Sequence, residues 1–129
     1  METFSVKTAQ RTEMLDITRQ IQKAVTESKV RDGICCVFVP HTTAAVTINE
    51  NADPNVARDI LMKLGKVIPP DDKYSHTEGN SDAHIKTSLV GSSETIIVED
   101  GKLVLGTWQS VFLCEFDGPR SRRFLVKII

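Results

Sequence analysis

The sequence predicts a single α+β domain over residues 1–129, mainly an antiparallel β-sheet or sandwich with two principal helices. The composition, 40% hydrophobic and 26% charged, is typical of one globular domain with its own core. Two segments repeat apolar residues at helical spacing, and about seven others are short and either alternating or uniformly apolar. Short turns join most of these segments, which favours antiparallel pairing.

The N-terminal part predicts a strand followed by a helix. Glu2–Thr8 alternates weakly between apolar and polar residues and favours a strand. Asp16 is suited to cap a helix that ends before the turn residues Asp32-Gly33. The apolar positions of this helix recur at helical spacing: Ile17, Ile21, Ala24 and Val25.

Two strands and a second helix follow. Ile34–Val39 is uniformly apolar and too short for a buried helix, so it predicts a buried strand, and the alternation of Ala44–Glu50 predicts another. Asp53-Pro54 marks a helix start, with a capping carboxylate before a proline at the first helical position, and Gly65 marks its end. The apolar stripe of this helix consists of Val56, Ile60, Leu61 and Leu64.

The remainder of the chain predicts only strands. They are expected at residues 84–90, 95–98, 103–105, 108–116 and 123–129. Asp100-Gly101 is a hairpin signal of type I′, and Asp117-Gly118-Pro119 is a turn before the last strand.

Charge and cysteine content exclude several classes of protein. The net charge is −1 and no cluster of Lys and Arg with interleaved aromatic residues stands out, so nucleic-acid binding is not expected. No apolar run approaches membrane-spanning length, and the first residues lack an apolar signal region. The three cysteines form no CxxC motif and favour a reducing compartment, so we expect a cytoplasmic protein that does not associate with membranes.

All three histidines lie in polar, turn-rich surroundings. His41 and His84 are each expected at the mouth of a strand, where a scaffold holds a side chain rigidly and leaves it accessible. His76 shares the polar stretch 71–84 with His84, and between them lie Glu78, Asn80 and Asp82. Imidazole and carboxylate groups bind borderline divalent metals and serve as acid/base groups. On composition alone, an idle surface loop is the alternative.

Three motifs, in this order, resemble the YjbQ-like family of small single-domain proteins. They are PHTTAAVTINENADP, YSHTEGNSDAHIKTSLVG and LGTWQSVFLCEFDGPR, and the resemblance covers essentially the whole chain. It implies an α+β sheet fold, a homotrimer, and an activity as a secondary thiamine-phosphate synthase. The motif positions correspond here to His41, Thr42, Thr43, Asn49, Glu50, Asp53, His76, Glu78, Asn80, Asp82, His84, Gln109 and Arg120.

The implied reaction joins a pyrimidine methyl diphosphate to a thiazole phosphate and releases pyrophosphate. With the resemblance added, we expect His41, His76 and His84 to bind one divalent metal, for which zinc is the favoured ion. The candidate catalytic residues, which would orient the imidazoles or act as acid/base groups, are Asn49, Glu50, Glu78 and Asp82. The candidate residues for a phosphorylated or other anionic ligand are Thr42, Thr43, Asn80, Gln109 and Arg120.

Other functions stay open at this point. Three histidines differ from the oxygen-ligated magnesium sites that handle diphosphates, so a zinc-dependent hydrolase of an ester or amide also fits. A non-catalytic trimer that captures a metal or a small anion fits too, although three ligands leave a coordination position open, which favours catalysis. Trimer contacts alone would be unusual for so charged a loop. Arg120 either binds an anion or pairs with Asp117 or Glu115 at a solvated strand end.

Overall fold

A computed structural model of the chain describes residues 1–129 and contains eight strands in two antiparallel sheets with three helices. The five strands of sheet A are, in spatial order, β1 (Glu2–Lys7), β8 (Ser121–Ile128), β3 (Gly33–Phe38), β5 (Ser93–Glu99) and β6 (Lys102–Leu103). The three strands of sheet B are β2 (Glu13–Asp16), β7 (Gln109–Glu115) and β4 (Ala44–Glu50). The helices are α1 (Thr18–Ser28), α2 (Pro54–Val67) and α3 (Ser81–Val90). The predicted α+β class with a dominant antiparallel sheet is confirmed.

The main core lies between the two sheets and α1. Ile21 and Val25 of α1 are fully buried, as their helical spacing predicted, and they pack with Val37 of sheet A and Leu113 of sheet B in one cluster. Burying side chains of this size stabilises a fold by roughly 1.5–3 kcal/mol each. This core fixes the two sheets relative to each other and so fixes the loops at their ends.

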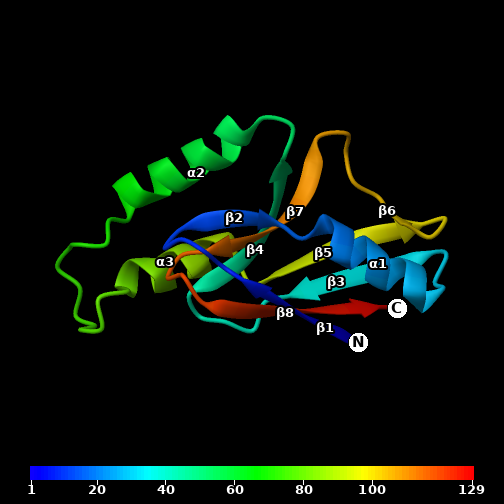
Figure 1. Ribbon diagram of the computed structural model, residues 1–129, viewed down its shortest axis with the longest axis horizontal. Helices are drawn as coiled ribbons and strands as arrows, with labels where there is room; N and C mark the ends of the chain where they lie inside the picture. Colours follow the sequence, from blue (N-terminus) through cyan, green and yellow to red (C-terminus); the bar gives the residue numbers. More distant parts are fainter.

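The outer face of sheet B carries a second layer, formed by α3 and α2. A smaller cluster joins Ala83 of α3 to Phe112 and Cys114 of sheet B. Figure 1 shows α2 farther out, connected to α3 through a long segment. None of the α2 residues is fully buried, although its apolar stripe partly covers the second cluster. None of the helices has the length and apolar character needed to cross a membrane.

The strand predicted at His84–Val90 is wrong, because Ser81–Val90 forms α3. The helix begins after Asn80, carries Asp82 in its first turn, and ends at Gly91, which has a positive φ of 101°. These are ordinary helix boundary signals. The buried face of α3 is largely polar, so the segment lacks the apolar stripe by which the other two helices are recognised.

Smaller differences concern element boundaries. β2 is an additional short strand, which forms because Glu13–Asp16 pairs with β7. α2 continues past Gly65 to Val67. Asp16 does bond the start of α1, where its Oδ1 accepts from the Thr18 N–H at 2.9 Å.

The hairpin predicted at Asp100-Gly101 is confirmed. It joins β5 to β6, and the two residues have φ values of 54° and 74°. Positive φ at both central positions is what a type I′ turn requires, and glycine adopts it without strain.

Candidate functional site

His76 and His84 lie side by side at the N-terminal end of α3. His84 projects from the first turns of the helix, and His76 comes from the loop before it. Their ring centroids are 5.3 Å apart and the ring planes are nearly perpendicular, at 86°. Two imidazoles that bind one tetrahedral zinc, with bonds of about 2.0–2.1 Å, place their ring centres on the order of 5 Å apart. The spacing of this pair therefore fits a shared divalent ion.

A hydrogen bond from the helix start orients the His76 ring. Its Nδ1 lies 2.9 Å from the Oγ of Ser81, the first residue of α3, whose side chain is almost completely buried. In the tautomer in which Nδ1–H donates to Ser81, Nε2 carries the free lone pair. A carboxylate oxygen of Glu78 lies 3.7 Å from that Nε2, and Glu78 is exposed. The predicted proximity of Glu78 to a histidine is thus present.

His41 is held differently. It follows β3, and its Nε2 accepts a hydrogen bond of 3.0 Å from the backbone N–H of Arg123. Partial burial lowers the pKa of His41, and the charges of Arg122 and Arg123 lower it further. The ring is therefore neutral at pH 7, and the tautomer that accepts at Nε2 carries its proton on Nδ1.

Two hollows meet at His84. The first, which we call the 76–84 hollow, has a volume of about 380 Å³ and is lined by Tyr74, Ser75, His76, Ser81, His84 and Ile85. The second, the 41–84 hollow, has a volume of about 350 Å³ and is lined by His41, Thr42, His84, Thr87, Ser88, Gly91 and Ser92. No carboxylate is among the residues that line either one. His84 stands between the other two histidines, so all three belong to one polar region.

The fit of a metal to this region is partial. In this conformation no three His, Cys, Asp or Glu side chains are arranged to hold a metal ion. His76 and His84 have suitable spacing, whereas the Nε2 of His41 is engaged by the Arg123 N–H. A neutral imidazole is the form that binds metals, which suits His41. The convergence of all three histidines on one ion therefore stays a prediction.

Asp82, a candidate acid/base residue, forms a buried ion pair. Its side chain is 0% exposed and accepts from the Lys86 Nζ at 2.9 Å, one turn along α3. Arg11 adds a second cationic contact at 3.1 Å. Because both carboxylate oxygens are occupied, Asp82 anchors α3 to the rest of the fold and does not line either hollow.

Thr43, a candidate anion ligand, belongs to a second buried ion pair. The guanidinium of Arg122 donates to the Thr43 Oγ1 at 2.8 Å and to the Glu115 carboxylate at 2.9 and 2.5 Å. Burial alone would raise the pKa of Glu115, but hydrogen bonds from Arg122, the Asp117 N–H and Thr8 hold it below its ordinary value. This network joins sheet B to sheet A, and the charges of Arg122 and Glu115 both act on the pKa of His41.

Arg120 and Asn80 both contact Asp117. The Arg120 guanidinium lies 3.0 Å from the Asp117 carboxylate, and the Asn80 amide donates to the same oxygen at 2.8 Å. Arg120 does not line the histidine hollows. This contact is the ion pair that the sequence offered as the alternative to anion binding.

The remaining motif residues lie at the opposite end of sheet B. Glu50 pairs with Gln109 in the register of β4 and β7, and Asn49 is their neighbour. Asp53 caps α2 by accepting from the Asn55 N–H at 2.9 Å. A strand of seven residues spans about 20 Å, so these side chains do not meet the imidazoles within one chain.

Four residues of α3 that line the two hollows were not predicted: Ser81, Ile85, Thr87 and Ser88. A helical interpretation of the segment would have found two of them, because His84, Thr87, Ser88 and Gly91 recur at the i, i+3, i+4, i+7 spacing of one helix face. The prediction of a strand placed these residues on alternating faces and concealed the shared wall.

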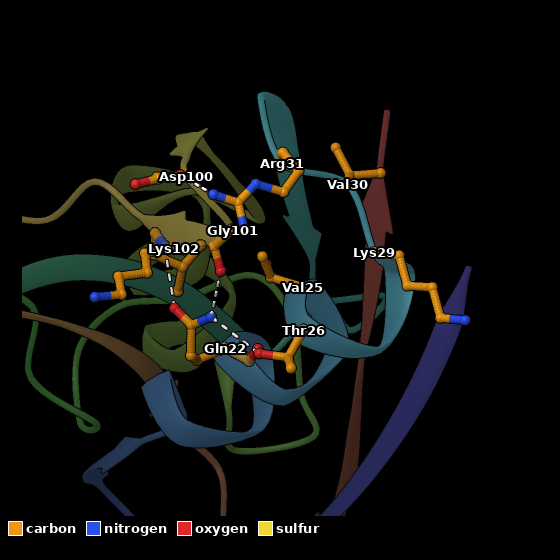
Figure 2. Close-up of a pocket in the computed structure, with 10 residues that line it drawn as sticks. Gln22, Val25, Thr26, Lys29, Val30, Arg31, Asp100, Gly101 and Lys102 are labelled. Atoms are coloured by element: carbon orange, nitrogen blue, oxygen red, sulfur yellow. Dashed lines mark hydrogen bonds and ion pairs between the residues drawn. The ribbon is translucent and has the colours of Figure 1, made fainter.

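A further groove lies between α1 and the β5–β6 turn, and several of its polar side chains bond one another or the backbone. Figure 2 shows Gln22 in this groove, where its amide bonds the Gly101 carbonyl and Thr26. Its carbonyl oxygen accepts from the Leu103 N–H, and Arg31 pairs with Asp100. These polar groups are already satisfied, so they leave little to recognise a ligand.

Comparison with known proteins agrees with this description. The family described as "UPF0047 protein YjbQ-like" matches residues 2–129. A UPF0047 protein of Methanocaldococcus jannaschii is 60% identical over 126 residues, covering 98% of this chain and 91% of that protein. The UPF0047 protein YugU of Bacillus subtilis is 46% identical over 130 residues, covering 100% and 98%.

Solved structures share the fold over its full length. An uncharacterized conserved YjbQ/UPF0047 protein from Clostridium acetobutylicum superposes with a TM-score of 0.99, at 58% identity and 100% coverage of both chains. A protein of unknown function from Sulfolobus solfataricus gives a TM-score of 0.95 at 38% identity, covering 98% of this chain and 94% of that one. The chain belongs to the YjbQ-like, UPF0047 family.

Proposed function

We propose that the protein is a metal-dependent enzyme that hydrolyses a phosphorylated or otherwise anionic small molecule at the histidine region. The single observation that carries the proposal is the pair of imidazoles, His76 and His84, whose ring centres are 5.3 Å apart beside two hollows. Borderline ions such as zinc favour imidazole ligands in this arrangement.

His76 and His84 would hold the ion, and His41 would be the third ligand. A bound divalent ion supplies positive charge that polarises a substrate oxygen and lowers the pKa of water. His41 reaches such an ion only if its ring gives up the hydrogen bond from the Arg123 N–H, because a ring that accepts at Nε2 carries its proton on Nδ1. The lowered pKa of His41 keeps its ring neutral at pH 7, so no proton has to be displaced from a charged imidazolium first.

The protein groups around this pair have separate tasks in the proposal. In the tautomer in which Nδ1–H of His76 donates to Ser81, Nε2 would be free to bind the ion. Glu78, exposed and 3.7 Å from that Nε2, is placed to accept or deliver a proton beside His76. Asp82 keeps α3 in position through Lys86 and takes no part in proton transfer.

The choice between hydrolysis and thiamine-phosphate synthesis depends on the kind of ion that the site would take. Release of a diphosphate calls for a hard, oxygen-ligated magnesium ion, and no carboxylate lines either hollow. The residues that line the two hollows include histidines and no carboxylate, so they are better suited to an imidazole-bound ion that activates water. Thiamine-phosphate synthase activity, which the family resemblance implied first, therefore becomes the alternative and belongs in the same set of assays.

We further propose a homotrimer in the cytoplasm. The apolar stripe of α2 is only half-buried in one chain, and Met62 and Val67 on this helix are 47% and 65% exposed. A partner chain would cover such a surface. All three cysteines are free thiols, which is consistent with a reducing compartment.

Metal analysis of natively purified protein tests the proposal. We expect about one zinc or similar ion per chain, and a loss of metal affinity of at least 100-fold in His76→Ala and in His84→Ala. Leu89→Ala on an exposed part of α3 is the control and should keep its metal. A protein that binds no zinc under dialysis, or His84→Ala with unchanged zinc affinity, would refute the metal site. Ester and phosphate-ester hydrolysis and thiamine-phosphate formation are then measured on the zinc-loaded protein.

A further inference from the structure

A cavity of about 220 Å³ lies between α2 and the outer face of sheet B, and we call it the α2 cavity. Ile60, Leu61 and Leu64 of α2 form its outer wall. Cys114 of β7 and Phe116, just after that strand, form its inner wall. The cavity shares no lining residue with the two hollows beside the histidines, so the proposed function gives it no task.

The space exists because α2 packs loosely on the fold. No residue of α2 is buried, and Leu61 and Leu64 stay half-buried although they contact the second cluster. That cluster contains two alanines, Ala45 and Ala83, which fill little of the space under the helix. Figure 1 shows α2 farther out than α3. Protein interiors hold few voids larger than a water molecule, so an apolar cavity of this size is unusual.

The walls of the α2 cavity favour an apolar occupant. Met14 of β2 and Val90 of α3 close its sides, so that seven of the nine lining residues are hydrophobic. A buried water needs about two to four polar partners, which walls of this kind do not offer. An apolar cavity of about 150 Å³ in another protein stays dry and binds benzene. The α2 cavity therefore has room for an aromatic ring with a substituent.

Cys114 adds a thiol to the inner wall that behaves as an apolar group. Burial, with a contribution from the charge of Glu94, raises the pKa of this thiol to about 12. The thiol therefore stays protonated at pH 7, and a protonated thiol is a poor nucleophile. A ligand in the cavity would be held by packing and not by a covalent bond to Cys114.

One end of the cavity is polar but carries no charge. Thr47 and Asn49 lie on one face of β4, because side chains two residues apart on a strand share a face. The Oδ1 of Asn49 accepts from the Glu50 N–H at 2.7 Å, which leaves the amide nitrogen to donate to a ligand. No charged side chain lines the cavity, so an ionic group would lose its hydration without gaining a partner.

We propose that the α2 cavity binds a small uncharged organic molecule with an apolar ring and one hydrogen-bonding group. The ring would lie between Leu64 and Cys114, and the polar group would meet Thr47. A helix without buried residues moves outward at a low free energy, so α2 would open to admit the ligand and close over it. The inference goes beyond the proposed function, because it needs neither the histidines nor a metal.

Two probes, toluene and p-cresol, test the inference on the wild-type protein. Each is titrated into the protein, and NMR detects nuclear Overhauser effects between the probe and the methyl groups of Leu61, Leu64 and Val90. We expect these effects, a higher melting temperature with either probe, and slower amide hydrogen exchange in α2. Absence of binding at millimolar toluene, or effects confined to other residues, would overturn the inference.

Leu64→Trp fills the cavity with a side chain of the protein itself. We expect its affinity for toluene to fall at least about tenfold. Its melting temperature without ligand should equal or exceed that of the wild type, because the indole ring occupies empty space. Lys63→Trp adds the same ring at an exposed position of α2 and should leave toluene affinity unchanged. A folded Leu64→Trp protein with wild-type toluene affinity would contradict the proposal.

The chemical class of the ligand is tested with Thr47→Val and with a charged probe. Thr47→Val keeps the shape of the side chain but removes its hydroxyl, so p-cresol should bind about three- to tenfold more weakly while toluene binds as before. The anion p-toluate resembles p-cresol in shape and should bind at least about tenfold more weakly. Tighter binding of p-toluate, or p-cresol binding that ignores Thr47→Val, would overturn the proposed class. Neither probe needs the histidines, so zinc analysis that refutes the proposed function leaves this inference standing.

Discussion

Replacing Lys86 by Met tests whether the ion pair beneath the histidine region holds α3 in place. The Lys86 Nζ lies 2.9 Å from Asp82, with exposed fractions of 2% and 0% for the two side chains. Removing one partner of such a pair generally costs about 3–5 kcal/mol, because a buried charge is left without compensation. Arg11 still contacts Asp82 from a position that is 43% exposed, so we expect the lower end, about 3 kcal/mol.

Urea denaturation measures this loss directly. For a chain of 129 residues, 3 kcal/mol corresponds to a fall in melting temperature of about 10 °C. Lys23→Met is the matched control, since Lys23 and Glu27 form a pair with the same i,i+4 spacing on an exposed surface. That variant should change stability by less than about 0.5 kcal/mol.

The outcome also decides the role of Asp82. Asp82→Asn should lose stability comparably while zinc affinity at 25 °C stays within a few-fold of the wild type. If Lys86→Met stays within about 1 kcal/mol of the wild type, the buried pair does not stabilise the fold as described. A stable Asp82→Asn protein without activity would return Asp82 to the candidate catalytic residues.

Three further predictions concern His41, Arg122 and Gly33. Burial lowers the pKa of His41 from 6.5, so the unfolded chain takes up a proton on this residue at a higher pH than the folded chain does. The stability of the fold should therefore decrease as the pH drops below about 6.5, and it should decrease less in His41→Gln. Thermal melts across this pH range measure the difference. Arg122→Met leaves the buried Glu115 carboxylate without its cation and should cost about 3–5 kcal/mol at pH 7 in urea denaturation. The pairing lowers the pKa of Glu115 in the wild type, so its contribution to stability is lost as the pH falls and Glu115 takes up a proton, and the two proteins should differ less at acid pH. An equal loss at pH 3 would contradict this account. Gly33→Ala places a Cβ 2.2 Å from the Ile129 carbonyl, so we expect a loss of about 1–3 kcal/mol by calorimetry, and an unchanged melting temperature would show that the C-terminus moves freely aside.

The two larger helices and most strands could be predicted because their buried residues are apolar. Ile21 and Val25 repeat at helical spacing, and Ala44–Glu50 pairs along its whole length with β7. α3 could not be recognised in this way, since Asp82, Lys86 and Thr87 are buried on it. A hydrophobic pattern does not reveal a helix whose inner face is satisfied by ion pairs and hydrogen bonds.

The sequence located the histidine region but not the roles of its neighbours. The positions of the histidines at segment ends follow from local pattern. The partner of Arg122 at Glu115, and that of Asp82 at Arg11, depend on how distant strands and α3 pack. Tertiary structure therefore decides which polar residues line a hollow and which are paired with a distant residue.

The length of β4 has a consequence for genetics. One end of this strand lies by Thr43 and the other by Glu50, so a single chain keeps the two groups of motif residues about 20 Å apart. If both groups serve one active site, they must come from different copies of the chain. Co-expression of His84→Ala and Glu50→Gln chains, each inactive alone, would then restore some activity, because a mixed oligomer holds one intact composite site. If the groups serve separate purposes, mixing these chains restores nothing.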